Sequence, residues 1–287
     1  AVSAVVVAQR LSSLVRLEHT VFALPYAYVG AVLAADGWPG IGPMVWITVA
    51  MAGARTLAMA LNRLIDAEID ARNPRTATRD IPAGRLTKAQ VATLCAIALV
   101  VFGIALSQLP RITWYLSPIV IAGFVIYPYL KRFTPLCHLW LGVVDGLAPV
   151  GAWIAVTGRV DPEPFLLLGV VAAWMTGFDV IYATVDVEVD RAQGLHSIPA
   201  DIGIARGLRL CRALHVLCVA LMVAVGLALG LGVAYYVGVA ACGALLAYEN
   251  AIVRPDDLSR VNAAFFNVNA VIAGLYLAAV VADVAIR

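Results

Sequence analysis

Nine long apolar stretches leave this chain few folds to choose from. Each stretch approaches or reaches the roughly 20 mostly apolar residues that a helix needs to cross the hydrocarbon core of a bilayer. They cover residues 17–35, 43–62, 89–108, 112–129, 137–157, 164–185, 211–230, 233–250 and 263–284. Because these stretches use most of the 287 residues, we expect a single all-α membrane domain over residues 1–287, without a separate soluble domain.

The composition supports a membrane protein. Hydrophobic residues make up 62% of the chain, charged residues 13%, and the mean hydropathy is +0.91. Soluble domains contain about 45–50% apolar and about 25% charged residues, so a soluble enzyme and a disordered chain are both excluded. A net charge of +2 gives no indication of nucleic-acid binding. The five cysteines form no CxxC pair, which is typical of small buried side chains rather than a metal site.

The basic residues predict the orientation of the chain. Of the 20 lysines and arginines, 16 lie before the first span or after the second, fourth, sixth and eighth spans. Cytoplasmic loops carry an excess of basic residues. We therefore expect an integral, multi-pass protein of the inner or plasma membrane, with a cytoplasmic N-terminus, cytoplasmic long loops and the C-terminus outside.

Two clusters of carboxylates stand where apolar spans end. Asn62, Asp66 and Asp70 follow at four-residue intervals after the second span, so one continuous helix would place them on one face. Asp186 and Asp190 repeat this spacing after the sixth span, at an offset of 120 residues. We therefore predict a weak internal duplication, with one motif region near residues 55–88 and the other near 179–206.

These carboxylates predict a metal site. Stacked like charges destabilise a helix, so two facing clusters need cations between them. Asp and Asn oxygens suit Mg²⁺, which prefers a few carboxylates, several waters and substrate phosphate oxygens. A solvated position at the membrane interface is the alternative for one cluster, but two clusters favour a diphosphate bound through Mg²⁺. The expected metal ligands are Asn62, Asp66, Asp70, Asp186 and Asp190.

At these residues the chain resembles the UbiA superfamily of intramembrane prenyltransferases. The family's first signature, N-x-x-x-D-x-x-x-D, matches the first cluster. Its second signature, D-x-x-Y-x-x-x-D-x-x-x-D, matches Asp179, Tyr182, Asp186 and Asp190. Two loop segments also match, Arg79-Asp-Ile-Pro-Ala-Gly84 and Tyr127-Pro-Tyr-Leu-Lys131-Arg132.

The resemblance implies a fold and an activity. The family fold has nine transmembrane helices around a central cavity, with cytoplasmic cap loops over the motifs. Its members transfer a polyprenyl group from polyprenyl diphosphate to an acceptor. Several further segments resemble the 4-hydroxybenzoate polyprenyltransferase branch, and especially the menaquinone enzymes of the futalosine route. We therefore expect a Mg²⁺-dependent enzyme of ubiquinone or menaquinone biosynthesis, with a hydroxybenzoate- or dihydroxynaphthoate-type aromatic acceptor.

Individual residues receive expected roles. The aspartates of the two clusters and Tyr182 are the expected catalytic residues, with Tyr182 stabilising an allyl cation through its ring or binding the diphosphate. Basic side chains supply fixed positive charge for the diphosphate. Asp145, in the middle of a span, positions the acceptor or pairs with Arg55. The expected substrate-binding residues are Arg55, Asn62, Arg79, Tyr127, Lys131, Arg132, Asp145 and Asp179.

Two alternatives remain at this point. One is prenyl transfer to another acceptor, such as a porphyrin, a chlorin or a sugar phosphate. The other is a cation-coupled secondary transporter, although transporter sites usually lie near the bilayer midplane rather than at helix ends. Polar residues of the spans, His19, Asn262, Asn267 and Asn269, either line the acceptor pocket or bond between helices. His138 and His215 are expected at the membrane interface.

Overall fold

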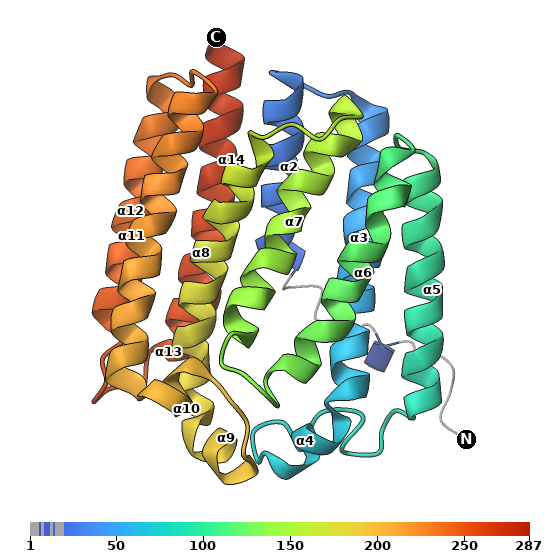
Figure 1. Ribbon diagram of the computed structural model, residues 1–287, viewed down its shortest axis with the longest axis vertical. Coiled ribbons are helices and arrows are strands. Elements are labelled where there is room, and N and C mark those ends of the chain that lie inside the picture. Colours follow the sequence, from blue (N-terminus) through green and yellow to red (C-terminus); the bar gives the residue numbers. More distant parts are fainter. Residues whose placement is uncertain (1–5, 7–8, 12–13, 15–19) are drawn as a thin grey trace.

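Helices make up all the regular structure in the described part of the chain. The computed structural model describes residues 6, 9–11, 14 and 20–287, and His19 lies outside these residues. The long helices run along the long axis of the molecule (Figure 1). They are α2 (Thr20–Ala35), α3 (Ile41–Ile65), α5 (Lys88–Ser107), α6 (Ile112–Leu130), α7 (Cys137–Thr157), α8 (Pro164–Ala183), α11 (Ile204–Ala228), α12 (Val233–Ile252) and α14 (Asn269–Ile286).

Each of the nine predicted stretches coincides with one of these helices. Among the described residues, seven helices are long and apolar enough to cross a membrane, judged by length and composition. Neither α2 nor α12 is among the seven, and α2 is described only from Thr20 onward. The structure therefore supports a multi-helix membrane fold.

The helices form three adjoining groups. As Figure 1 shows, α11, α12 and α14 lie on one side, α3, α5 and α6 on the other, and α2, α7 and α8 between them. The largest buried core cluster joins the central group to α11, α12 and α14. Its aromatic side chains include Tyr26 and Trp174, whose ring centroids are 4.9 Å apart. Aromatic rings in such tilted contacts stabilise a core beyond the area they bury.

Two glycines bring α7 into backbone contact with α8. A Cβ atom on Gly142 would lie 2.5 Å from the carbonyl oxygen of Ala172, and one on Gly146 would lie 2.8 Å from that of Leu168. Small residues four apart are the usual means by which membrane helices approach closely. This contact aligns the ends of α7 and α8 at which the second carboxylate cluster begins.

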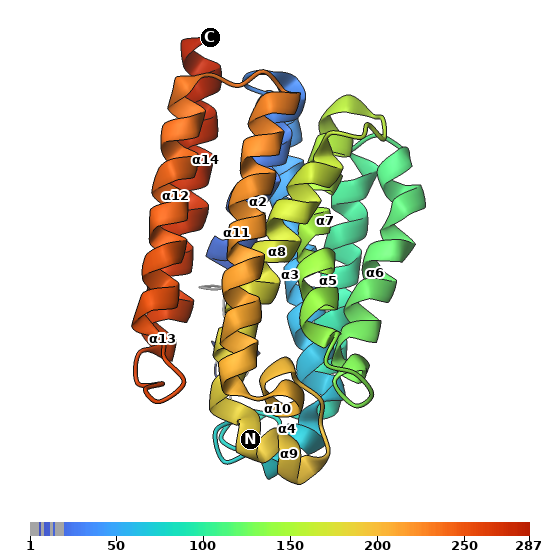
Figure 2. The same cartoon turned by 60° about the vertical axis from the view of Figure 1, so that its left-hand side comes forward.

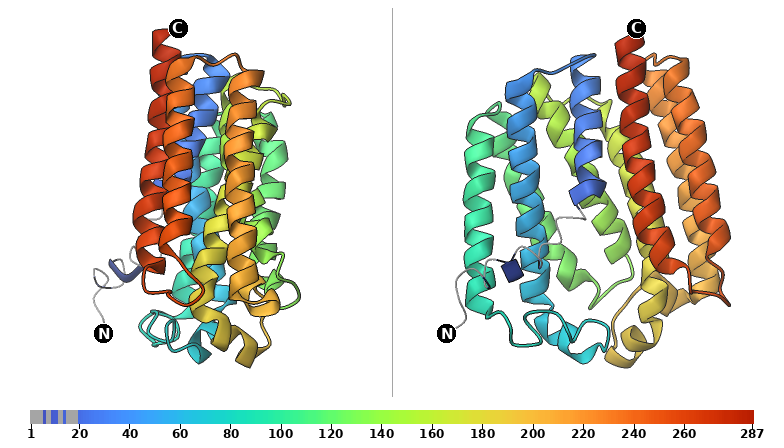
Figure 3. Two further views of the ribbon diagram at one scale, coloured as in Figure 1. Left: turned by 90° about the vertical axis from the view of Figure 1, so that its left-hand side faces the viewer. Right: turned by 180° about the vertical axis from the view of Figure 1, so that it is seen from behind.

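Three short helices form a cap at one end of the bundle. They are α4 (Ala67–Arg72), α9 (Val187–Gln193) and α10 (Ile198–Ile202), and the C-terminus lies at the opposite end (Figure 2). Both views in Figure 3 show the cap below the same end of the long helices. Helix α11 begins at Ile204, earlier than the predicted 211, because its first turns carry arginines that an apolar search omits. A π-helical turn, Ala264–Val268, precedes α14.

Candidate active site

Both carboxylate motifs lie on interrupted helices. Helix α3 ends at Ile65 and α4 starts at Ala67, so Asp66 stands in the break with φ −89° and ψ 2°. Between α8 and α9 a 3₁₀ turn covers Thr184–Asp186, and Asp186 has φ −106° and ψ 2°. The prediction of one continuous helix through each motif is therefore wrong. Both aspartates adopt the sparsely populated bridge region that is frequent in active sites.

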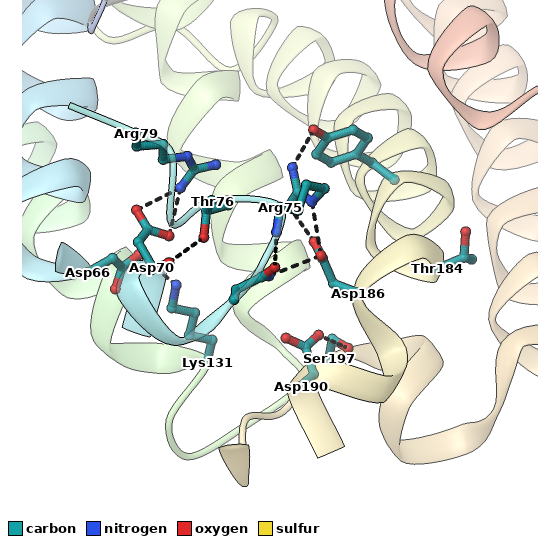
Figure 4. A network of polar contacts seen from close by, with 12 residues as sticks. Asp66, Asp70, Arg75, Thr76, Arg79, Lys131, Thr184, Asp186, Asp190 and Ser197 are labelled. Carbon is teal, nitrogen blue, oxygen red and sulfur yellow. Dashed lines mark hydrogen bonds and ion pairs between the residues drawn. The ribbon is translucent and has the colours of Figure 1, made fainter. Parts of the chain in front are cut away.

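Asp66 is held by two donors at one of its oxygens. Lys131 Nζ donates to Asp66 Oδ2 at 2.6 Å, and both residues are drawn in Figure 4. Asn62 Nδ2 donates to the same oxygen at 3.1 Å. The other oxygen, Oδ1, is buried without a hydrogen-bond partner, and the residue is 2% exposed. Burial raises the pKa of Asp66, while the Lys131 ammonium acts in the opposite direction.

The second aspartate of each cluster, Asp70 or Asp190, has a partner of its own. Arg79 Nη1 donates to both carboxylate oxygens of Asp70, at 2.7 Å each. The hydroxyl of Ser197 donates to Asp190 Oδ2 at 2.9 Å, and it also accepts from the backbone N–H of Ala200 as the N-cap of α10. We did not predict Ser197, although Ser followed closely by Pro is a recognisable helix start.

Asp186 is held by the loop that follows the first motif. Arg75 Nε donates to Asp186 Oδ1 at 2.9 Å, and Arg75 Nη2 contacts Oδ2. Asn73 Nδ2 adds a third donor at 3.1 Å, while Arg75 Nη1 donates to the hydroxyl of Tyr182 at 2.9 Å. We did not predict Asn73 or Arg75, and the signal for them is the Asn-Pro pair directly after the first motif, which is typical of a turn.

The Lys131-Arg132 segment has two separate roles. Lys131 donates to Asp66 of the first motif, while Arg132 Nη2 donates to the carbonyl oxygen of Ile65 at 3.1 Å and lies 3.9 Å from Asp66 Oδ1. Arg132 therefore caps the C-terminus of α3, which its charge also stabilises. The backbone N–H of His196 donates to the Lys131 carbonyl at 2.7 Å and connects this segment to the loop after the second motif.

A polar pocket at the cap end unites most of the predicted site. Its lining includes Asn62, Asp66, Asp70, Arg79, Tyr127, Lys131, Asp179, Tyr182, Asp186 and Asp190. An adjoining pocket shares Asn62, Tyr127, Asp179 and Tyr182 with it and adds Arg55 and Asp145. Arg55 and Asp145 in turn border an apolar cavity among α2, α3, α5, α6 and α7. The three pockets thus run from charged groups at the cap into the apolar centre of the bundle.

Two further side-chain pairs line this path. Arg55 Nη1 lies 3.7 Å from Asp145 Oδ2, as the sequence allowed. His138 Nδ1 lies 2.6 Å from Asp179 Oδ2, and the other ring nitrogen of His138 is buried without a partner. His138 and His215, which the sequence predicts at the membrane interface, are buried within the protein, at 5% and 3% exposed. The close packing of α7 on α8 is what buries His138.

The polar residues near the start of α14 serve different purposes. Asn269 is fully buried, accepts a hydrogen bond from Trp174 Nε1 at 2.7 Å and donates to Glu249 at 2.8 Å. It therefore joins three helices, as the interhelical alternative predicted. Asn267 is exposed, and Asn262 lines a second polar pocket beside Arg79.

The five expected metal ligands line one pocket, and they fit a hard cation by donor type. All offer oxygen atoms, and Asp66 Oδ1 is a buried carboxylate oxygen without a hydrogen-bond partner, 3.9 Å from Arg132 Nη2. Within the described residues, no three His, Cys, Asp or Glu side chains lie close enough to hold a metal. The distance between the carboxylates follows from their basic partners, because a lysine or arginine side chain stands beside three of the four aspartates.

Comparisons with known proteins agree with this architecture. The model of the UbiA prenyltransferase family matches residues 23–271. The 4-hydroxybenzoate octaprenyltransferase of Alkalilimnicola ehrlichii is 32% identical over 84% of this chain and 82% of its own length. The apo structure of a UbiA homologue from Aeropyrum pernix K1 has a TM-score of 0.85 and 34% identity, over 93% of this chain and 98% of that one. A UbiA homologue from Archaeoglobus fulgidus bound to DMAPP and Mg²⁺ has a TM-score of 0.72 and 17% identity, over 97% and 100% of the two chains.

Proposed function

The chain belongs to the UbiA prenyltransferase family, and from this we propose that it transfers a polyprenyl group from polyprenyl diphosphate to an aromatic acceptor. The acceptor is of the hydroxybenzoate or dihydroxynaphthoate type, and the product enters ubiquinone or menaquinone biosynthesis. The 4-hydroxybenzoate octaprenyltransferases among its relatives support the aromatic class.

One observation carries this proposal. The charged pocket at the cap continues past the side chains of Tyr127 and Tyr182 into an apolar cavity. A polyprenyl diphosphate has the same polarity, with an anionic head and a long apolar tail. The charged end therefore binds the diphosphate, and the apolar end accommodates the first part of the tail and excludes water from the allyl cation.

The carboxylates define where a divalent cation belongs. We propose that Asn62, Asp66, Asp70, Asp186 and Asp190 hold Mg²⁺, a conclusion that depends on their oxygen donors in one pocket. When bound, Mg²⁺ supplies positive charge that stabilises the leaving diphosphate. Lys131 and Arg79 stand beside Asp66 and Asp70 and add positive charge to the same pocket.

The remaining residues act on the reacting groups. Tyr182 lines both the charged and the adjoining pocket, so its ring is available to the allyl cation where the two meet. Tyr127 and Asp179 line the same junction and orient the substrates there. Arg55 and Asp145 line the deeper part and position the aromatic acceptor.

We also propose the membrane arrangement. The nine long helices cross the bilayer, the cap and the N-terminus are cytoplasmic, and the C-terminus is outside. The basic residues of the cap-side segments support this orientation. The chain forms one domain of two related halves, which the matching breaks at Asp66 and Asp186 support.

Product analysis tests the proposal. Membranes containing the protein are incubated with Mg²⁺, a polyprenyl diphosphate and either 4-hydroxybenzoate or a dihydroxynaphthoate, and the products are identified by mass spectrometry. We expect a prenylated aromatic acid, and a loss of about 10²-fold or more in the Asp66→Ala variant. A product formed only with a porphyrin, chlorin or sugar phosphate would establish another acceptor. Cation uptake without any prenylated product would establish the transporter alternative.

A further inference from the structure

The loop after the first motif is built to place Arg75 on the second motif. Asn73 ends α4 in an extended conformation, as a residue before proline prefers. The backbone N–H of Arg75 donates to the side-chain oxygen of Asn73 at 2.9 Å, which fixes the turn. Thr76 adds a hydrogen bond from its hydroxyl to the carbonyl of Asp70 at 2.9 Å. The guanidinium of Arg75 is thereby directed across the pocket to Asp186 (Figure 4).

Arg75 neutralises the carboxylate that it contacts and binds both of its oxygens. Asp186 Oδ1 accepts from Arg75 Nε and Asn73 Nδ2, and Asp186 Oδ2 accepts from Arg75 Nη2. The same guanidinium also contacts the Tyr182 hydroxyl and lies 5.2 Å from the centre of the Tyr182 ring. A bidentate arginine–carboxylate pair of this kind is one of the strong hydrogen-bonded contacts in proteins. A cation that approaches Asp186 therefore meets the positive charge of Arg75 and competes with it for both carboxylate oxygens.

We propose that Arg75 exchanges partners: it neutralises Asp186 in the substrate-free enzyme and contacts the diphosphate once Asp186 turns to a divalent cation. This inference rests on the proposed function, because it assigns a task to Arg75 within the same pocket. Arg75 becomes a substrate-binding residue that also controls access to a metal ligand.

Three properties of Arg75 suit such an exchange. Its planar fork of N–H donors matches a phosphate group as well as a carboxylate, and it stays protonated in both states. Its side chain is 38% exposed, so the guanidinium can turn without leaving a packed core. It lines the charged pocket together with Lys131 and Arg79, where the anionic head is proposed to bind.

The exchange makes the two ligands depend on each other. A cation at Asp186 competes with the Arg75 guanidinium for the carboxylate, and a diphosphate gains a strong donor once Arg75 has left Asp186. Each ligand therefore removes part of the cost of binding the other, which is positive coupling between two sites. Without Arg75, Asp186 is free for a cation but the diphosphate loses a contact.

Binding measurements test the exchange without relying on turnover. Titration calorimetry on the purified full-length protein measures Mg²⁺ binding alone, and then the binding of inorganic diphosphate at saturating Mg²⁺. In Arg75→Gln we expect Mg²⁺ alone to bind about 10-fold more tightly and diphosphate to bind about 10-fold more weakly, since a charge-assisted hydrogen bond accounts for that much. Arg75→Lys, which keeps the charge but loses the fork, should change both affinities in the same directions by less.

The control and the contrary outcomes are specific. Arg159 Nε lies 3.7 Å from Asp161 Oδ1 in the loop between α7 and α8, at the end of the bundle opposite the cap (Figure 1), so Arg159→Gln should leave both affinities unchanged. Weaker Mg²⁺ binding in Arg75→Gln, with a lowered melting temperature, would make Arg75 a structural clamp and overturn the inference. Unchanged Mg²⁺ binding in Arg75→Gln would overturn it as well. The proposed function fails separately, if the wild-type protein binds neither Mg²⁺ with diphosphate nor a prenyl donor.

Discussion

Arg55 Nη1 in α3 and Asp145 Oδ2 in α7 are 3.7 Å apart, near enough for charge pairing but beyond hydrogen-bond distance. Both side chains are about 15% exposed or less, and Arg55 Nε and Asp145 Oδ2 are buried without hydrogen-bond partners. A charge inside a membrane bundle is costly unless it is paired or lines a cavity, and these two residues do both. The open hydrogen-bonding capacity between them suits a polar substituent of the aromatic acceptor.

Asp145→Asn should therefore change the choice of acceptor. The substitution keeps the shape but removes the charge opposite Arg55, so the ratio of kcat/KM for 4-hydroxybenzoate and a dihydroxynaphthoate should shift by about 10-fold. Kinetics with one prenyl donor and both acceptors measure this ratio. An equal loss with both acceptors would show that the pair acts only in packing. Asp36→Asn, in an exposed ion pair with Arg287, is the matched control and should have no effect.

Removal of divalent cations should abolish turnover reversibly. Chelation with EDTA leaves the carboxylates of Asp66, Asp70 and Asp186 to their lysine and arginine partners, without a cation for the diphosphate. Added Mg²⁺ should restore the rate, and the amount of prenylated product is the measurement. Full activity in EDTA would contradict the proposed metal site.

The contact between His138 and Asp179 should support catalysis. Loss of the His138 imidazole leaves Asp179 without its 2.6 Å partner, so its carboxylate is no longer oriented at the junction of the two pockets. We expect His138→Leu to reduce kcat/KM about 10-fold or more, which is the effect of a hydrogen bond to a charged group. His138→Gln keeps an amide donor and should recover part of the loss.

The control for this prediction is the second buried histidine. His215 is bonded to Asn250 at 2.7 Å, in a different part of the bundle. His215→Leu should lower the melting temperature but leave kcat/KM within a factor of about two. Equal effects of His138→Leu and His215→Leu on kcat/KM would mean that both residues act through stability alone.

Gly142→Ala should destabilise the bundle. The added Cβ would lie 2.5 Å from Ala172 O and 2.6 Å from Thr176 Oγ1, so α7 and α8 must separate. Overpacking of this kind costs about 1–3 kcal/mol. Thermal unfolding in detergent measures the loss. Gly274→Ala is the control, because nothing lies within 4 Å of the added atom, and its melting temperature should stay the same or rise.

Reporter fusions should separate the two ends of the protein. The cap and the C-terminus lie at opposite ends of the bundle (Figure 1). A reporter fused after Arg287 should therefore indicate a location outside the cytoplasm. One inserted near Arg72, an exposed cap residue, should indicate a cytoplasmic location. Identical readings from the two fusions would contradict the proposed number of crossings.

The local features of this protein were determined by its sequence alone. The apolar stretches predicted the long helices. A segment with apolar side chains enters the lipid, and there its backbone N–H and C=O groups must bond to each other, which a helix achieves within one segment. The two motifs and their matching spacing predicted one shared site, and Asp66 and Asp186 indeed line one pocket. The spacing did not predict the break at each aspartate, because the same pattern is compatible with an unbroken helix.

The partners of the charged side chains were decided only by the tertiary structure. Lys131 meets Asp66 across 65 residues, and Arg75 meets Asp186 across 111. Such pairs depend on how closely the helices pack, as at Gly142, and on the Asn73 turn that directs one loop across the pocket. A basic residue in a loop has many carboxylates of opposite charge available to it, because electrostatic attraction has no preferred sequence separation. Only the packed helices restrict that choice to one partner.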